Sequence, residues 1–255
     1  MRAWLKAAAG PALKRETLSL WAIILKRGCR LTEQAIKIDE IKKRAKKAAA
    51  GRQVLIVAAA KQQDSTAVRA AICAGIEDVG ENRVQELSAK YDEGAYKGAR
   101  LHFIGRLQSN KINALLGKVF LIHSVDSLKL LEQISQRAIR RQIVQDVLLQ
   151  VNIGNEDSKG GFKPDEMHDI CKIAGRFSCV KVRGLMAIPP VLTEEGGNCR
   201  YFHSMRELFI DIEAKQYDNI DMEFLSMGMS MDFEDAIAAG ANIVRVGSAI
   251  FGARS

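Results

Sequence analysis

Short apolar runs alternate with amphipathic stretches along most of the chain. The run 54–60 is apolar throughout, a pattern typical of a strand buried on both faces. Seven further short apolar segments follow, each succeeded by a stretch of helical periodicity with a polar cap or a glycine near its start. The predicted strands are 54–60, 77–79, 101–105, 119–123, 147–153, 180–188, 223–226 and 243–246.

Helices are predicted between these strands, at about 32–50, 64–74, from 82, from 109, 126–141, 164–177, 197–215, 232–239 and from 247. Continuous strand–helix alternation requires a parallel sheet with right-handed crossovers. Eight such units in about 225 residues are typical of a single (β/α)8 TIM barrel. An open doubly wound α/β sheet is the alternative fold.

Residues 1–30 differ from the rest of the chain and are predicted to be an N-terminal extension outside the domain, which then covers 31–255. They carry seven basic side chains and one acidic one. Their apolar run 18–25 is too short to span a bilayer, and basic residues follow it where a secretory signal has small ones. The extension is either a transit peptide or a translated stretch upstream of the true start, and Thr32 is the predicted N-cap of the first helix.

Composition and charge exclude several classes of protein. The chain has 47% hydrophobic and 27% charged residues, close to the average for a soluble globular protein. The formal net charge is +8, but residues 1–30 account for +6, so the domain has no strongly basic composition and we expect no nucleic-acid partner. Five dispersed cysteines without a Cys-x-x-Cys pair indicate neither a disulfide framework nor a metal site. We therefore expect a cytoplasmic protein without a membrane partner.

The first predicted strand is followed at once by a lysine, Lys61. The carboxyl ends of barrel strands form the functional face, and an amine placed there can act as a nucleophile toward an aldehyde or ketone. The alternative is a strand-end lysine that simply reaches solvent.

Two glycine- and serine-containing turns follow the seventh and eighth predicted strands, at 226–232 and 247–252. Barrels commonly bind phosphate at these two turns, because glycine lets backbone N–H groups approach the anion. The hydroxyl groups that can add hydrogen bonds belong to Ser226, Ser230 and Ser248. The two turns together with the strand-end lysine predict a phosphate-bearing aldehyde as ligand, although glycine and serine also make ordinary turns and caps.

Arg245 lies within the last predicted strand, between two valines. If its side chain points inward it needs an acceptor, since a buried charge is costly without one. The ring nitrogen of a pyridine-containing cofactor would be a suitable acceptor. An arginine there would keep that nitrogen unprotonated and make the cofactor ring a weaker electron sink. An ion pair with Glu223 or Glu81 is the alternative.

Other polar residues near predicted strand ends have two interpretations each. Asn82 can face a ligand or cap the next helix. His102 is interpreted as a hydrogen-bonded residue of the barrel wall rather than a catalyst. His123 and Asp126 can form a pair at the site, or the helix that follows is capped by Asp126 or Ser127.

From about residue 31 to 255 the chain resembles the pyridoxal phosphate homeostasis proteins, small proteins that bind pyridoxal 5'-phosphate (PLP) in an alanine-racemase-like barrel. Lys61 matches the lysine that carries PLP as an internal aldimine in that family. The matching segments are Ala60-Lys61, Gly80-Glu81-Asn82 with Val84-Gln85-Glu86, His102 to Lys111, Ile122 to Ser127, Gln150 to Asn152, Ser158 to Phe162, Gly184 to Pro190, Leu225 to Ser230 and Val244 to Gly252.

The resemblance also implies a set of cofactor contacts. Arg245 would lie near the pyridine nitrogen, and the phosphate would be bound by Ser226, Gly228, Ser230, Gly247 and Ser248. The chain departs from the family pattern at 62–65, after the lysine, and at Arg83 and Arg106, where an aromatic residue and a histidine are expected.

Two functions of different classes fit the resemblance. One is a monomeric PLP carrier or regulator without turnover of its own, which affects PLP supply to PLP-dependent apoenzymes. The other is a fold-type III amino-acid racemase or decarboxylase, whose relatives carry a further β domain that supplies a second catalytic residue, commonly a tyrosine. The chain ends nine residues after Val246, and its tyrosines fall on or beside predicted helices, which favours the carrier. A class I aldolase acting on a sugar phosphate is a more distant third.

Overall fold

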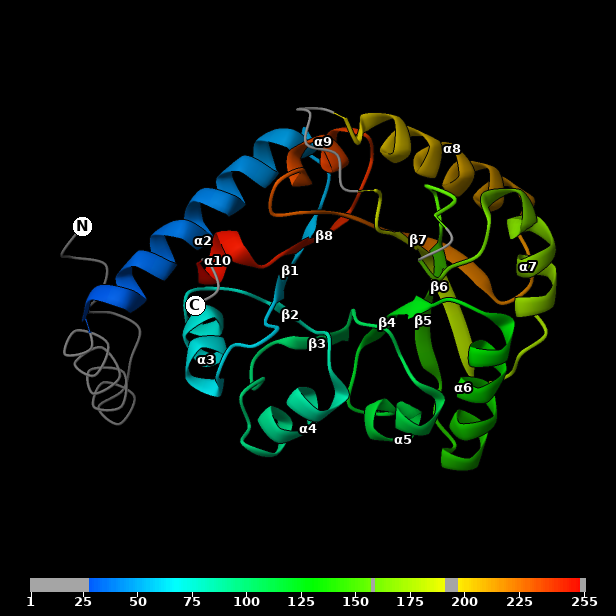
Figure 1. Ribbon diagram of the computed structural model, residues 1–255, viewed down its shortest axis with the longest axis horizontal. Helices are drawn as coiled ribbons and strands as arrows, with labels where there is room; N and C mark the ends of the chain where they lie inside the picture. The colour runs from blue at the N-terminus through cyan, green and yellow to red at the C-terminus, as the bar shows by residue number, and fades with distance from the viewer. Residues whose placement is uncertain (1–27, 157–158, 191–196, 253–255) are drawn as a thin grey trace, which may run out of the picture.

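A computed structural model of the chain describes residues 28–156, 159–190 and 197–252 (Figure 1). Its eight strands are parallel and pair in chain order, and the last pairs with the first, which closes the sheet into a barrel. The strands are β1 (Leu55–Ala59), β2 (Asp78–Glu81), β3 (Arg100–Phe103), β4 (Leu121–Val125), β5 (Gln145–Val151), β6 (Val180–Ala187), β7 (Ile220–Met229) and β8 (Ile243–Val246). The predicted TIM barrel is confirmed, and the open sheet is excluded because an open sheet leaves two edge strands unpaired.

The helices lie outside the ring of strands (Figure 1). They are α2 (Gly28–Ala49), α3 (Ser65–Cys73), α4 (Val84–Asp92), α5 (Ile112–Leu115), α6 (Leu128–Arg141), α7 (Met167–Ala174), α8 (Cys199–Lys215), α9 (Phe233–Ala238) and α10 (Ser248–Phe251), with 3-10 turns η2 (Ser109–Lys111) and η3 (Pro164–Glu166). Two begin at caps that the sequence indicates: the side chains of Asp64 and Ser127 accept the N–H groups of Ala67 and Leu130. No helix in these three ranges is long and apolar enough to cross a membrane.

The first described helix begins earlier than predicted. α2 already includes Gly28, so Thr32 lies within the helix, and its prediction as the N-cap is wrong. Residues 1–27 of the predicted extension lie outside the described residues. The helix packs against α9 through Arg44, which pairs with Glu234 and lies 4.9 Å from the centroid of the Phe233 ring.

One strand is longer than its apolar run indicates. The prediction for the seventh strand was 223–226, whereas β7 runs from Ile220 to Met229. Ser226 therefore lies inside the strand, three residues before its end, where it is fully buried. This difference decides what Ser226 can contact.

The core has two parts. Most buried apolar residues fill the space between strands and helices. A smaller cluster, contributed by seven of the eight strands or their ends, contains Val57, Ile104, Leu121, Leu148, Met186, Phe224 and Ile243. Buried polar side chains come from the same strands, among them His102, His123, Ser226 and Arg245, so the barrel is not filled by apolar layers alone.

Candidate functional site

A cavity of about 320 Å³ opens where β1, β2 and β8 end. Six of the eight predicted site residues line it: Lys61, Asn82, Ser230, Arg245, Gly247 and Ser248. The rest of its wall is Ala59, Gln63, Ile104, Ile188, Met229, Met231, Phe251 and Gly252. The structure thus brings the strand-end amine, the strand-embedded guanidinium and both glycine–serine turns to one place.

Barrel closure puts Lys61 beside the last turn. β1 pairs with β8 in a register that sets Ala58 opposite Val246, so the segments that follow these two strands leave the barrel side by side. Gly247 allows this close approach, because a Cβ there would lie 3.3 Å from the carbonyl oxygen of Ala59. The two parts of the predicted site are far apart in sequence and adjacent only in the closed barrel.

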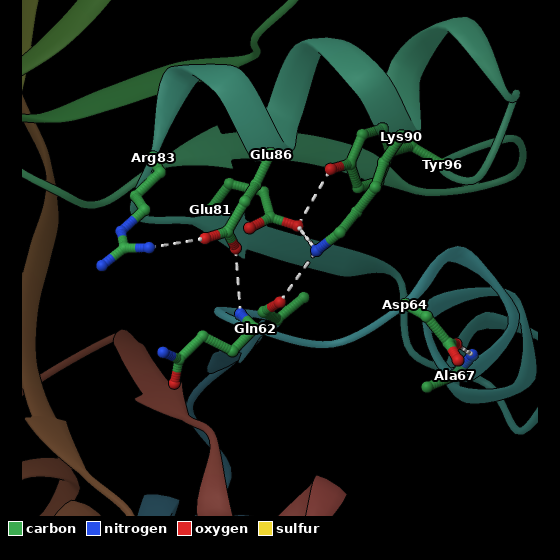
Figure 2. Close-up of polar contacts among 9 residues, drawn as sticks. Gln62, Asp64, Ala67, Glu81, Arg83, Glu86, Lys90 and Tyr96 are labelled. Carbon is green, nitrogen blue, oxygen red and sulfur yellow. Dashed lines mark hydrogen bonds and ion pairs between the residues drawn. The ribbon is translucent and has the colours of Figure 1, made fainter. Parts of the chain in front are cut away.

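Helix α4 holds the backbone on both sides of Lys61 (Figure 2). On one side, Lys90 Nζ donates to the carbonyl oxygen of Ala60 at 3.0 Å. On the other, the N–H of Gln62 donates to Glu86 Oε2 at 2.9 Å. We call these two contacts the α4 clamp. Sequence reasoning did not identify Lys90 or Glu86 as parts of the site, since nothing in their helical pattern points to β1.

The lysine of the clamp belongs to a buried polar network (Figure 2). Lys90 Nζ lies 2.7 Å from Glu81 Oε1, and the Tyr96 hydroxyl donates to the same oxygen at 2.9 Å. The Glu81 side chain is fully buried, and its Oε2 has no partner among the described residues. Burial raises the pKa of Glu81, although the hydrogen bond from Lys90 opposes the shift.

Arg245 points into the barrel and reaches the cavity. Its NH1 group donates to the carbonyl oxygen of Ser226 at 2.9 Å and to Ser226 Oγ at 2.7 Å, and NH2 donates to the carbonyl oxygen of Ala187 at 2.9 Å. Burial lowers the pKa of Arg245 to about 10, so the guanidinium stays charged at neutral pH.

Both predicted ion-pair partners of Arg245 are wrong. Glu81 pairs with Lys90, and Glu223 pairs with Arg183. In the part of the chain that the structure describes, no carboxylate lies within ion-pair distance of Arg245. A buried cation that lines a cavity without a counter-ion is suited to a ligand that offers an acceptor.

Two predicted site residues do not line the cavity. Ser226 Oγ lies 2.7 Å from Arg245 NH1 and 3.0 Å from His123 Nδ1, deeper in the barrel. Gly228 has φ of +89°, and a Cβ there would lie 2.5 Å from the Cβ of Ala236, so this glycine lets β7 pack closely against α9. The roles of Ser226 and Gly228 as phosphate contacts stay predictions, and the structure gives each another role.

The two glycine–serine turns contact each other. Ser230 Oγ accepts the N–H of Gly247 at 3.1 Å, and Asp232 Oδ1 holds the first turn by accepting the N–H of Met229 at 2.7 Å. Ser248, the first residue of α10, is exposed on the cavity wall. Hydroxyl and backbone N–H groups of this kind are the usual donors to a phosphate.

The remaining predictions for polar residues are resolved by contacts. Asn82 lines the cavity, and the N-cap of α4 is Arg83. Ser127, not Asp126, caps α6. His102 and His123 are fully buried and hydrogen-bonded to each other, as the interpretation of His102 as a wall residue requires.

The cavity offers little for acid–base or metal chemistry. Its titratable side chains are Lys61 and Arg245. No tyrosine or histidine is among the described residues that line it. The same ranges contain no group of His, Cys, Asp or Glu that could hold a metal ion, and Cys73, Cys171, Cys179 and Cys199 are free thiols.

Known protein families and curated proteins include several that are similar to this chain. A family model described as "Alanine racemase, N-terminal domain" matches residues 35–255. A protein of Aquifex aeolicus (strain VF5) named "Pyridoxal phosphate homeostasis protein" is 45% identical over 187 residues, which cover 73% of this chain and 81% of that protein.

Solved structures share the barrel. The structure of PipY of Synechococcus elongatus PCC7942 with PLP bound has a TM-score of 0.76 and 30% identity, covering 86% of this chain and 100% of PipY. Diaminopimelate decarboxylase from Helicobacter pylori, complexed with L-lysine, has a TM-score of 0.67 at 16% identity, covering 85% of this chain and 62% of the decarboxylase. The second likeness shows the fold alone.

Proposed function

The chain belongs to the family of pyridoxal phosphate homeostasis proteins, and on this basis we propose that it binds PLP and takes part in intracellular PLP homeostasis. The observation that carries the proposal is the single cavity that joins Lys61, Arg245 and the two glycine–serine turns. An amine, a cation without a counter-ion and a cradle of hydroxyl and N–H donors match the aldehyde, the ring nitrogen and the phosphate of PLP.

Each residue has a defined part in holding the cofactor. The Lys61 amine would link covalently to the aldehyde, and the Ser230 and Ser248 hydroxyl groups would donate to the phosphate beside Gly247. Arg245 would donate to the ring nitrogen, and Asn82 would contact the cofactor from the end of β2. PLP supplies an electron sink that is strongest when its ring nitrogen is protonated. A charged Arg245 only donates hydrogen bonds, so it disfavours that proton and the carbanion chemistry that depends on it.

The same cavity supports a carrier or regulator without turnover. A racemase or decarboxylase needs a second acid or base positioned at the reacting carbon. Tyr96 is bound to Glu81 and Tyr217 to His168, and neither Tyr91 nor Tyr201 lines the cavity. We therefore favour a monomeric cytoplasmic protein that affects PLP supply to apoenzymes over a fold-type III amino-acid racemase or decarboxylase.

The first test is the covalent link. Protein mixed with PLP should gain the visible absorbance of the attached cofactor, and borohydride reduction followed by peptide mass mapping should place the modification on Lys61. Lys61→Ala should abolish the absorbance and leave the circular dichroism unchanged. Lys118→Ala, which removes a lysine near the Tyr91 ring, is the matched control and should bind normally. Modification of another lysine in the wild-type protein would contradict the assignment.

The second test separates carrier from enzyme. PLP-loaded protein should neither racemise alanine nor release CO₂ from diaminopimelate or other amino acids. It should pass PLP to an apoenzyme whose activity reports the transfer. Turnover that disappears in Lys61→Ala would establish the enzyme instead.

A further inference from the structure

A continuous series of side-chain hydrogen bonds crosses the barrel interior below Arg245. Asp78 Oδ1 lies 2.9 Å from His102 Nε2, and His102 Nδ1 lies 2.9 Å from His123 Nε2. His123 Nδ1 lies 3.0 Å from Ser226 Oγ, which lies 2.7 Å from Arg245 NH1. Asp78 begins β2 and Arg245 lies near the end of β8, so the series leads from the amino-terminal end of the barrel to the cavity.

With both imidazoles neutral, the carboxylate end fixes the direction of every bond in this series. The carboxylate of Asp78 only accepts, so His102 carries its proton on Nε2 and accepts at Nδ1. His123 must then donate from Nε2 and accept at Nδ1, and the Ser226 hydroxyl must donate to it. The guanidinium of Arg245 only donates, so it requires the lone pair that Ser226 Oγ has left. The arrangement that Asp78 imposes therefore leaves Ser226 Oγ able to accept from Arg245.

The surroundings keep both histidines neutral. His102 and His123 are fully buried, and burial lowers the pKa of each, well below 6.5 for His123. For His102 the hydrogen bond that it donates to Asp78 opposes the shift, and for His123 the charge of Arg245 adds to it.

The two ends are charged and differently compensated. Arg100 makes two hydrogen bonds to Asp78, at 2.7 and 2.8 Å. Burial alone would raise the pKa of Asp78, but the bonds from His102 and Arg100 outweigh it and hold that pKa below 3.8. At the other end, Asp232 favours the charge of Arg245 from beyond hydrogen-bond distance. A carboxylate and a guanidinium are thus joined by neutral groups only.

We propose that Asp78, His102, His123 and Ser226 form a polarised hydrogen-bond relay that positions Arg245 for the ring nitrogen of the bound cofactor. Each neutral imidazole turns its lone pair toward Arg245 and its N–H toward Asp78, so the aligned dipoles stabilise the cation at one end and the anion at the other. His123 and Ser226 act as positioning residues, since they reach the cofactor only through Arg245. The cofactor part of this inference rests on the proposed function.

The direction of the relay is testable on the cofactor-free protein. The chain has four histidines, and His168 and His203 lie outside the relay and serve as internal references. With 15N-labelled histidine, NMR should show His102 and His123 neutral and protonated on Nε2 from pH 5.5 to 8. A proton on Nδ1 of either ring, or protonation of either within this range, would overturn the relay.

The link to the cofactor is tested by Ser226→Ala with Ser135→Ala as control. Ser135 is also buried and donates to a carbonyl oxygen, that of Ser178, but it lies outside the relay. Ser226→Ala should weaken PLP binding about tenfold, as the loss of a hydrogen bond to a charged group does, and should shift the His123 ring resonances. Ser135→Ala should change neither.

The outcomes separate this inference from the proposed function. Wild-type protein that binds no PLP would end the proposed function, while the NMR result would still decide the relay. Wild-type and Ser226→Ala proteins that bind PLP equally well would end the positioning role alone. Where Ser226→Ala fails to fold, Ser226→Cys keeps a side chain of similar size and a weaker donor, and should give intermediate binding; binding equal to wild type would contradict the role.

Discussion

The two basic side chains that line the cavity are held by different kinds of structure. Lys61 is held through the backbone of its neighbours by the α4 clamp, whose groups all come from residues 60–90. Arg245 is held through its side chain by groups from β2, β3, β4, β6 and β7. The first arrangement is confined to one strand–helix–strand neighbourhood, whereas the second exists only when the whole barrel has closed.

The chemistry of the two supports differs as well. The clamp depends on a buried charged pair, Glu81 and Lys90, at 2.7 Å. The relay keeps its charges at the ends and places neutral imidazoles between them. Removing one partner of a buried charged pair lowers the free energy of unfolding, because the other charge stays buried without compensation. A relay of neutral groups is instead destabilised when its members gain protons. Measurements of unfolding free energy after mutation and at lower pH should therefore distinguish the clamp from the relay.

Loss of Lys90 should have the largest effect on stability. Lys90→Met leaves the fully buried Glu81 carboxylate without its counter-charge, which costs about 3 kcal/mol of unfolding free energy. Denaturant unfolding measures it, and adding Glu81→Gln to the same chain should recover part of the loss. Lys97→Met, at an exposed position, should change the unfolding free energy by less than about 0.5 kcal/mol. An equally small change in Lys90→Met would show that the clamp does not depend on this pair.

The second largest effect on stability is expected from mild acid. A fall in pH should lower the contribution of the relay to the free energy of unfolding and raise that of Glu81 beside the clamp. The unfolded chain binds protons at its histidines near pH 6.5, where the buried His102 and His123 have lowered pKa values. Stability should therefore fall as the pH drops below 6.5, by up to about 1.4 kcal/mol per pH unit for each histidine. Glu81 has a pKa that is raised in the folded protein. Its contribution to the free energy of unfolding is therefore fully present below pH 4.5 and is lost as the pH rises through the pKa of the folded state.

Unfolding free energies at pH 7.5, 6.5 and 5.5 measure the histidine effect. His123→Asn should reduce the slope of stability against pH, whatever it does to stability at pH 7.5. His203→Gln, which changes an exposed histidine, should leave the slope unchanged. Equal slopes in the wild-type and His123→Asn proteins would show that His123 is not held neutral.

The smallest effect on stability is expected at the exposed side of the clamp. Glu86→Ala removes the acceptor for the N–H of Gln62, which water can replace, so the cost should stay below about 1 kcal/mol. The backbone beside Lys61 loses one anchor, and the rate of covalent attachment of PLP should fall a few-fold in stopped-flow absorbance. Glu86→Gln keeps an acceptor oxygen and should restore the rate. Equal rates in all three proteins would show that the contact between Gln62 and Glu86 does not affect the attachment of PLP.

Local chemistry made part of this molecule predictable. Short apolar runs identify the eight strands, because a strand covered on both faces needs apolar side chains throughout. Lys61 at the end of one run and Arg245 inside another stand out for the same reason. The resemblance of the strand-end segments to one family then assigned them to PLP, and the matching proteins agree with it.

Other features depend on which segments become neighbours. The extra length of β7 is set by pairing with β6 and β8, and it moved Ser226 from the predicted cavity wall to the barrel interior. Lys90 and Glu86 are ordinary residues of a helical pattern until α4 packs beside the end of β1.

Hydrophobic periodicity and side-chain chemistry identify the strands, the reactive amine and the strand-embedded guanidinium, because both are local properties of the chain. The meeting of Lys61 with the glycine–serine turns, and the connection of Arg245 to Asp78, His102, His123 and Ser226, exist only in the folded barrel. The contact between His123 and Ser226 alone joins residues 103 positions apart. These contacts follow from strand register and barrel closure, which depend on all eight strands at once.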